Sequence, residues 1–191
     1  FVMHPMLNIA VRAARVAGSL IVRGFENRDD LVKQAKGAND YVTQIDKDAE
    51  MAIIHKIKQS YPDHSFLGEE SGETAGDSAE FQWIIDPLDG TTNFIKGIPH
   101  FAVSIALLHK GRLDQGVVFD PIRGELFTAS RGQGAQLNGY RIRASKARDL
   151  SETVLATGLP FKNKTQYADY AIRLNKIFHD CGDIRRAGSA A

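Results

Sequence analysis

The sequence predicts an α+β fold, or a layered α/β sandwich, with a largely antiparallel sheet. Three observations support this fold class. Two segments with the apolar spacing of helices come first, a run of short extended segments follows, and another helical segment lies near the end. Strands that follow one another across short turns, next to grouped helices, are typical of such a layered fold.

The first helix is expected over residues 5–25, where apolar residues recur every three or four positions. A second helix begins at Thr43 and runs to about residue 61. Pro62 stops it, because the residue before a proline disfavours the helical conformation. Between the two helices the chain is polar, and residues 36–40 are expected to form a loop or the tip of a hairpin.

The period then changes from helical to extended. Strands are expected at residues 66–67, 81–85, 102–108, 116–119, 125–129, 135–137, 140–142 and 154–156, and around Ile184. Residues 72–79 are predicted to be a polar loop, and Asn138-Gly139 is a strong signal for a two-residue hairpin turn. A helix is expected over residues 165–178. The last four residues, Gly188-Ser189-Ala190-Ala191, resemble the beginning of a further helix with Ser189 as its cap.

Length and composition are those of an ordinary folded domain, which we assign to residues 1–191. Phe1 and Val2 precede Met3, and we interpret them as residues left over from expression. Lysine plus arginine number 24 and aspartate plus glutamate 23, so the net charge of +1 gives no long-range attraction to nucleic acid or to anionic membranes. The sequence contains no run of eighteen apolar residues, so no membrane span is expected. The lone Cys181 excludes a disulfide within the chain and fits a reducing, cytoplasmic location.

The strongest chemical signal is the segment that follows the apolar strand ending at Ile85. Asp86 stands at the end of a buried strand, where a carboxylate is unfavourable unless it has a partner. Pro87 has no N–H and restricts the backbone, so Asp86 and Asp89 could be held as a rigid pair. The carbonyl of Leu88 could point the same way. Two carboxylates and a carbonyl are hard oxygen ligands suited to Mg²⁺.

The next residues, Gly90-Thr91-Thr92-Asn93, are expected to begin a helix. The free backbone N–H groups at such a helix start could bind a phosphate. A metal site next to an anion site is what phosphoryl transfer requires. Taken alone, Asp-Pro and Asp-Gly pairs are ordinary turn chemistry, and that interpretation is favoured for residues 86–90 by themselves. The Thr-Thr-Asn sequence and a second acidic pair upstream reverse the preference.

That upstream pair is Glu69-Glu70, directly after a predicted strand. The two glutamates could be solvated loop charges. Packed together with other carboxylates they would repel one another unless a cation compensated them. Asp46 also has two interpretations, because Thr43-x-x-Asp46 matches a capping box at the start of the second helix. Asp46 could serve as such a cap or turn toward the acidic site.

Three segments closely resemble the inositol monophosphatase family. They are Gly68-Glu69-Glu70-Ser71, the run from Trp83 to Phe94 that contains Asp-Pro-Leu-Asp-Gly-Thr-Thr-Asn, and Gly188-Ser189-Ala190-Ala191. The resemblance covers essentially every residue from Met3 onward. It implies a layered α-β-α-β-α sandwich of the sugar-phosphatase kind and a Mg²⁺-dependent, lithium-sensitive phosphomonoesterase that acts on myo-inositol 1-phosphate.

The same resemblance implies roles for individual residues. The implied metal ligands are Glu69, Asp86, Asp89 and the carbonyl of Leu88, with Glu70 near a further, weaker metal position. Thr91 and Asp46 resemble the pair that orients and deprotonates the attacking water. Backbone N–H groups of Gly90 and Thr91 would hold the phosphate. The residues implied to contact the substrate are Asp89, Gly188, Ser189 and Ala190.

One departure from the family pattern concerns the end of the chain. The family continues with a Trp-Asp-x-Ala-Ala-Gly segment whose aspartate ligates a second metal, and this sequence stops at Ala191. We therefore expect the C-terminal part of the domain to be missing. The second metal site would then be incomplete.

Two functional alternatives remain open at this point. Pocket residues outside the motifs decide the substrate, so another sugar phosphate or a nucleotide 3′-phosphate could replace inositol phosphate. The resemblance is strongest to a bacterial branch of the family and implies contacts with RNA polymerase and Nus factors in ribosomal RNA antitermination. Such contacts would be made through proteins, because the net charge does not favour autonomous nucleic-acid binding. Family members are commonly homodimers, which is the expectation here too.

Overall fold

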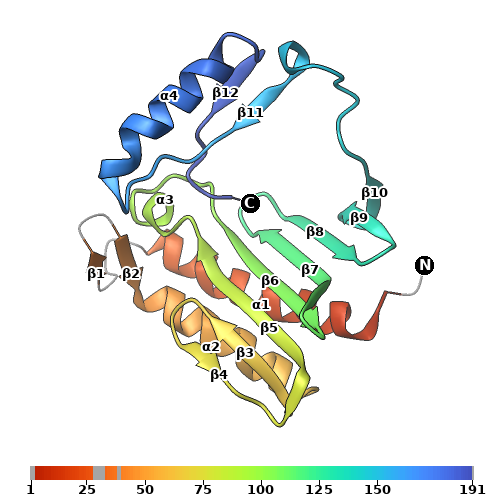
Figure 1. The fold of residues 1–191 in the computed structure, drawn as a ribbon. Helices are drawn as coiled ribbons and strands as arrows, with labels where there is room; N and C mark the ends of the chain where they lie inside the picture. Colours follow the sequence, from red (N-terminus) through yellow and green to blue (C-terminus); the bar gives the residue numbers. More distant parts are fainter. Residues whose placement is uncertain (1–2, 28–32, 38–39, 191) are drawn as a thin grey trace.

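The computed structural model describes residues 3–27, 33–37 and 40–190 of the chain. Its centre is an eight-stranded sheet with the strand order β10-β9-β8-β7-β6-β5-β3-β4 (Figure 1). The strands are β3 His64–Gly68, β4 Gly72–Thr74, β5 Ser78–Asp89, β6 Ala102–His109, β7 Arg112–Asp120, β8 Glu125–Ser130, β9 Gly134–Leu137 and β10 Tyr140–Ile142. Neighbouring strands are antiparallel except for β3 and β5, which run parallel. The largely antiparallel sheet predicted from the sequence is confirmed.

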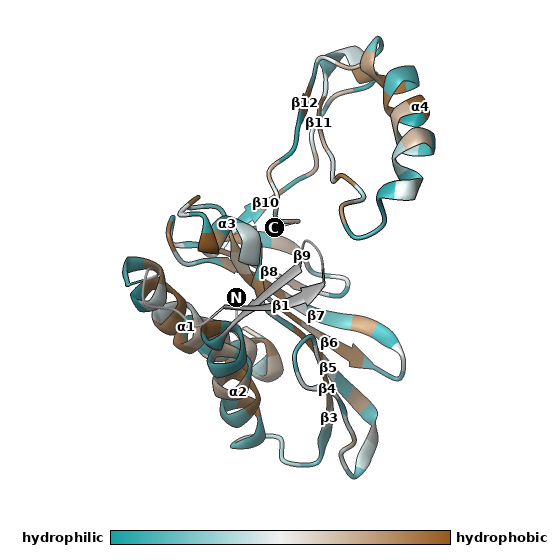
Figure 2. Cartoon of the chain, turned by 90° about the vertical axis from the view of Figure 1, so that its left-hand side faces the viewer, coloured by the Kyte–Doolittle hydropathy of each residue, from teal (hydrophilic) through white to brown (hydrophobic). Residues whose placement is uncertain are grey.

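Two helices, α1 (Pro5–Glu26) and α2 (Gln44–Lys58), lie side by side over one face of this sheet (Figure 2). The core between them and the sheet contains Phe66, Trp83, Phe94 and Phe101, all fully buried. Burying a side chain of this size contributes about 1.5–3 kcal/mol to folding. Helix α1 approaches the sheet closely at Gly18, where an added Cβ would lie 2.6 Å from the ring of Phe119.

By length and composition alone, α1 could cross a membrane, and it is the one helix among the described residues of which this is true. The sequence prediction of no membrane span relied on the lack of a run of eighteen apolar residues. In the structure the small and apolar residues of α1 face the core, with Ala13, Ala14, Ala17 and Ile21 fully buried. The helix therefore serves as a core helix of this domain.

The remaining elements are short. A hairpin joins α1 to α2, made of the antiparallel strands β1 (Lys33–Gly37) and β2 (Asp40–Thr43). It flanks the predicted tip, of which residues 38–39 lie outside the described residues. Helix α3 (Thr91–Ile95) directly follows β5. The chain ends with a small parallel sheet of β11 (Val154–Ala156) and β12 (Asp183–Arg185), joined through α4 (Tyr167–Phe178). Together these layers form the predicted layered α+β fold.

Several local predictions are confirmed and others are wrong. Asn138 and Gly139 form the expected turn, with φ of 49° and 84°. Residues 72–79 are not simply a loop, because β4 and the first residues of β5 lie there. Helix α4 forms as expected, yet none of its residues is buried. Gly188–Ala190 does not begin a helix in the described part of the chain.

Candidate active site

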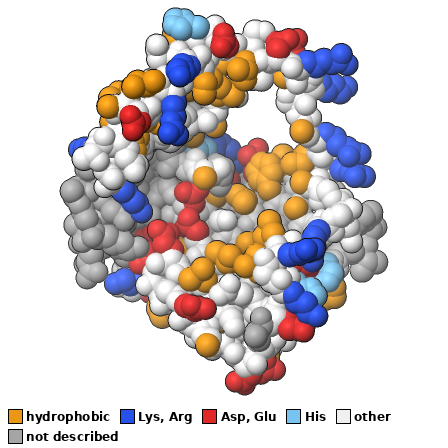
Figure 3. Space-filling view, viewed as in Figure 1, with side chains coloured by type: hydrophobic (Ala, Val, Ile, Leu, Met, Phe, Trp, Pro, Cys, Tyr) orange, Lys and Arg blue, Asp and Glu red, His pale blue; other side chains and the backbone are white. Residues whose placement is uncertain are grey.

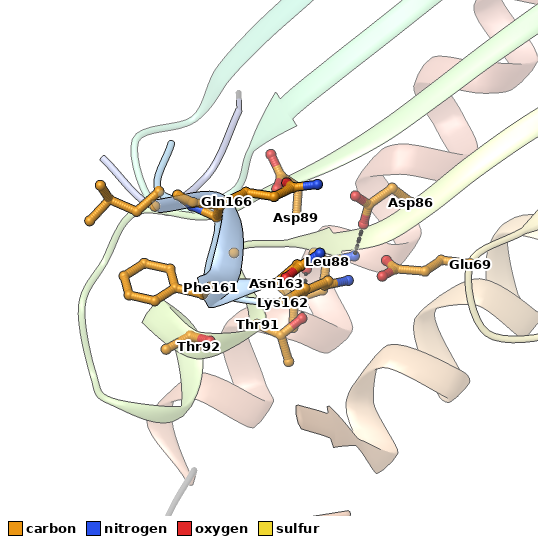
Figure 4. A pocket seen from close by; sticks show the side chains of 14 residues that line it. Glu69, Asp86, Leu88, Asp89, Thr91, Thr92, Phe161, Lys162, Asn163 and Gln166 are labelled. Atoms are coloured by element: carbon orange, nitrogen blue, oxygen red, sulfur yellow. Dashed lines mark hydrogen bonds between the residues drawn. The ribbon is translucent and has the colours of Figure 1, made fainter. Parts of the chain in front are cut away.

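A cavity of about 480 Å³ opens at the end of β5. Its walls from the large sheet are formed by Glu69, Asp86, Leu88, Asp89, Gly90 and Thr91. The opposite wall comes from the loop after β11, chiefly residues 159–163 (Figure 4). In the space-filling view, acidic side chains gather in the hollow between the large sheet and the β11–β12 unit (Figure 3). With Gly188, seven of the residues predicted for the site therefore share one cavity.

A bulge in β5 creates the turn that carries the two aspartates. Asp86 pairs with Ser104 of β6 and Asp89 pairs with Ala102, so three steps on β5 face two on β6. Pro87 falls inside this bulge, where its missing N–H removes no ladder hydrogen bond. The backbone N–H of Leu88 donates to Oδ1 of Asp86 at 3.2 Å (Figure 4). The strand thus continues through the motif, four residues beyond the predicted end at Ile85.

Asp86 lies in a strongly acidic environment. Burial raises its pKa to about 7, and the charges of Glu69 and Asp89 and a hydrogen bond with Glu69 act in the same direction. The hydrogen bond from Leu88 N–H acts in the opposite direction. Without a cation this cluster therefore keeps a proton near neutral pH. Carboxylate and carbonyl oxygens in such surroundings fit Mg²⁺ by charge and by ligand type.

Asp89 is engaged by the end of the chain. Its Oδ2 accepts hydrogen bonds from the hydroxyl of Ser189 at 2.7 Å and from the backbone N–H of Ala190 at 2.6 Å. Gly188 lines the cavity. In the described ranges, no three His, Cys, Asp or Glu side chains are already gathered as closely as a metal site requires. The predicted ligands thus line one cavity without converging on a single point.

Asp46 and Thr91 meet although 45 residues separate them. Asp46 lies in the first turn of α2 and is only 2 % exposed. The hydroxyl of Thr91 lies 3.1 Å from Oδ1 of Asp46 and 3.1 Å from the carbonyl of Leu88. The side chain of Asp46 is therefore directed toward the motif segment, as one of its two predicted roles requires.

Gly90 begins α3 in a conformation that only glycine adopts easily, with φ of 102°. There is also no room for a side chain. An added Cβ would lie 3.1 Å from the carbonyl oxygen of His100 and 3.2 Å from the Cβ of Ser189. The turn at Gly90 brings the N-terminus of α3 to the cavity wall. Because α3 has only five residues, individual N–H groups matter more there than a helix dipole.

Of the predicted site residues, Asp46, Glu70, Ser189 and Ala190 do not line this cavity. Glu70 instead contacts Glu50. Its backbone N–H donates to Oε2 of Glu50 at 2.9 Å, and its side chain is half-buried. Glu50 was not singled out by the sequence, although it follows Asp46 by four positions and so shares its helix face. Asn93 was noted only for its backbone. Its side-chain amide donates to the carbonyls of His100 at 2.8 Å and Ala187 at 3.0 Å, which ties the C-terminal stretch to α3.

Comparison with known proteins identifies the family. A sequence profile described as the inositol monophosphatase family matches residues 2–191. The Nus factor SuhB of Escherichia coli K12 is 60 % identical over 189 residues, which are 99 % of this chain and 71 % of that protein. The Nus factor SuhB of Vibrio cholerae is 53 % identical over the same shares of the two chains.

Solved structures show the same likeness. The extragenic suppressor protein suhB of Bartonella henselae superposes with a TM-score of 0.95 at 43 % identity, covering 98 % of this chain and 72 % of that one. An IMPase of Thermotoga maritima gives a TM-score of 0.83 at 33 % identity, covering 97 % and 69 %. The structural comparison and the sequence comparison therefore find the same proteins, SuhB and inositol monophosphatases.

Proposed function

The chain belongs to the inositol monophosphatase family, and from this premise we propose that it is a Mg²⁺-dependent phosphomonoesterase that hydrolyses myo-inositol 1-phosphate to inositol and phosphate. One observation carries the proposal. The hydroxyl of Thr91, held by Asp46, and the carboxylates of Glu69 and Asp86 line or adjoin one cavity. A proton acceptor beside carboxylates that could bind a cation is what metal-assisted hydrolysis needs.

The residues that would hold Mg²⁺ are Glu69, Asp86, Asp89 and the carbonyl of Leu88, with Glu70 near a weaker position. When bound, Mg²⁺ supplies positive charge that makes water more acidic and offsets the charge of the phosphate. The raised pKa of Asp86 supports this ligand set. Burial first, and then the charges of Glu69 and Asp89, disfavour its ionised form, which a bound cation would stabilise. Li⁺ would compete for the same oxygens, which accounts for the proposed lithium sensitivity.

The hydroxyl of Thr91 and the carboxylate of Asp46 form the proposed proton relay. Thr91 Oγ1 donates its one proton to Asp46 Oδ1, so its lone pairs can accept a hydrogen bond from the attacking water. As water attacks phosphorus, its proton passes to Thr91 Oγ1 while the threonine proton passes to Asp46. The carbonyl of Leu88, also 3.1 Å from Thr91 Oγ1, is a second acceptor for the same proton and keeps the hydroxyl oriented toward the bulge.

Substrate binding is assigned to the two segments that meet at Asp89. Backbone N–H groups of Gly90 and Thr91 would hold the phosphate oxygens. Asp89, Gly188, Ser189 and Ala190 would contact the ring hydroxyls. The hydrogen bonds that Asp89 accepts from Ser189 and Ala190 support this assignment, since polyol hydroxyls are donors of the same kind.

Phosphate release from myo-inositol 1-phosphate with Mg²⁺, with and without Li⁺, tests the proposal. Another sugar phosphate and a nucleotide 3′-phosphate in the same assay separate the substrate alternatives. We expect Mg²⁺-dependent turnover that is lost in Asp86→Asn. Turnover that survives this substitution would contradict the metal assignment, and preference for another ester would change the substrate but keep the chemistry.

A second candidate function follows from the name of the curated relatives. The Nus factor SuhB of Escherichia coli K12 is 60 % identical to this chain, which supports a role in transcription antitermination through RNA polymerase and Nus factors. A pull-down of the transcription machinery with the parent chain and with Asp86→Asn separates the two roles. Equal capture by both variants would mean that binding does not need the phosphatase site. Light scattering on the same samples tests the proposed homodimer.

A further inference from the structure

Glu50 is a buried carboxylate to which neither the sequence motifs nor the proposed reaction assigns a role. It lies on α2 and is 2 % exposed. Its Oε2 accepts the backbone N–H of Glu70 and its Oε1 accepts the backbone N–H of Ser71, each at 2.9 Å. The two oxygens of this one carboxylate therefore each accept one of two successive backbone N–H groups.

The contact is too close for any residue but glycine at position 68. A Cβ added to Gly68 would lie 2.7 Å from Oε1 of Glu50 and still nearer to Oε2, well inside van der Waals contact. The backbone turn between β3 and β4 therefore rests directly on the Glu50 carboxylate. Gly68 and Glu50 thus form a close contact between the sheet and α2.

This contact fixes the backbone around Glu69. On one side, the N–H of Glu69 donates to the carbonyl of Ile85, the residue before Asp86, at 3.1 Å. On the other side, the N–H of Glu70 is held by Glu50. With both neighbouring peptide groups anchored, the Glu69 side chain is directed toward Asp86 and Leu88 in the cavity (Figure 4).

The same helix also carries Asp46, one turn before Glu50 and on the same face. Asp46 holds Thr91 in the segment after β5, and Glu50 holds the turn after β3. Helix α2 thus sets the position of both segments relative to one another. A residue that orients ligands in this way is a recognised determinant of metal affinity.

We propose that Glu50 is a positioning residue, which holds the Glu69-Glu70-Ser71 turn so that Glu69 points into the cation cavity. This inference rests on the proposed function, because it concerns the ligands assigned to Mg²⁺. The group itself touches neither substrate nor metal. Its contribution passes through the backbone of residues 69–71.

The test compares Glu50→Ala and Glu50→Gln with the parent chain. Ala removes both acceptors, whereas Gln keeps the shape of the side chain and one acceptor oxygen. Ser130→Ala is the matched control, since it removes a buried hydrogen bond to Gln115 in the sheet, away from the cavity. Each variant is measured by thermal unfolding, by amide exchange at Glu70 and Ser71 without metal, and by calorimetric titration with MgCl₂.

We expect the Mg²⁺ Kd to rise roughly 10- to 100-fold in Glu50→Ala, the range for residues that orient metal ligands, and less in Glu50→Gln. Amide protection at residues 70 and 71 falls in parallel. Ser130→Ala loses thermal stability at unchanged Kd. If Glu50→Ala does not fold, the Kd of Glu50→Gln decides the matter.

Two other results would overturn the inference in different ways. A parent chain that binds Mg²⁺ together with Glu50 variants of equal Kd removes the positioning role and leaves the proposed function standing. A parent chain that does not bind Mg²⁺ removes the proposed metal site, and the inference with it.

Discussion

The hydroxyl of Ser189 donates a hydrogen bond of 2.7 Å to the carboxylate of Asp89, although 100 residues separate them in the sequence. Ala190 adds a second bond to the same oxygen at 2.6 Å. These contacts close the C-terminal stretch onto the bulge of β5.

Replacing Ser189 by alanine removes one of the two donors to Asp89. We expect the free energy of unfolding to fall by about 0.5–1.5 kcal/mol, the usual contribution of one hydrogen bond. Denaturant unfolding measures it. The control is Ser151→Ala, which removes an exposed bond to Asp149, two residues away. If both variants lose the same free energy of unfolding, the hydrogen bond between Ser189 and Asp89 contributes no more than an exposed one.

Asp86 should make the stability of the metal-free chain depend on pH. Its pKa is raised from 3.8 to about 7 on folding, so the folded state holds the proton more tightly than the unfolded state. The stabilisation from the protonated group is therefore complete below pH 4 and is lost as the pH rises through 7.

The variant Asp86→Asn tests this dependence, because it removes the charge and keeps an oxygen for the Leu88 N–H. In EDTA its melting temperature should exceed that of the parent at pH 8, and the difference should shrink toward pH 5. Mg²⁺ should then stabilise the parent and not the variant. A pH-independent difference would mean that Asp86 does not titrate near neutrality.

His64 should have the opposite effect on the pH dependence. It is buried between the rings of Tyr61 and Phe81, and its Nδ1 accepts the indole N–H of Trp83 at 3.0 Å. Burial lowers its pKa below 6.5. As the pH falls, His64 is therefore protonated in the unfolded state before it is protonated in the folded state. Stability from this group is present above pH 6.5 and is lost as the pH falls through the folded pKa.

His64→Gln should therefore be less stable than the parent at pH 7.5 but lose less stability between pH 7 and pH 5. Chemical denaturation at a series of pH values measures both. If the two proteins lose stability in parallel as the pH falls, the neutral state of His64 has no part in acid sensitivity.

Gly90 is required by its conformation and by its crowded surroundings. Gly124 offers a matched control, since its φ is also positive, at 68°, but nothing lies within 4 Å of an added Cβ. Gly124→Ala should cost about 1–2 kcal/mol from the left-handed conformation alone. Gly90→Ala should cost more, because the added Cβ also meets His100, Phe101 and Ser189. Similar losses by denaturant unfolding would argue against crowding at Gly90.

Most of the fold could be predicted from local patterns. Helix α1 and the turn at Asn138-Gly139 follow from the spacing of apolar residues and from the residues that tolerate positive φ. The missed strand β4 is a three-residue polar segment, and it exists because β3 offers it an edge to pair with. The exposure of α4 could not be predicted either. Its apolar side chains predict a helix with one apolar face, but they do not specify which element packs against that face.

The sequence by itself determined the family, because the segment from Asp86 to Asn93 is contiguous and can be recognised from the order of its residues. The family resemblance implied that Asp46 and Ser189 join this segment, but only the tertiary structure shows the contacts they make and adds Glu50. Asp46, Glu50 and Ser189 reach the site through contacts that span 45, 20 and 100 residues. Such contacts depend on how α2 packs against the sheet and on where the chain passes after β12, which no local sequence pattern specifies.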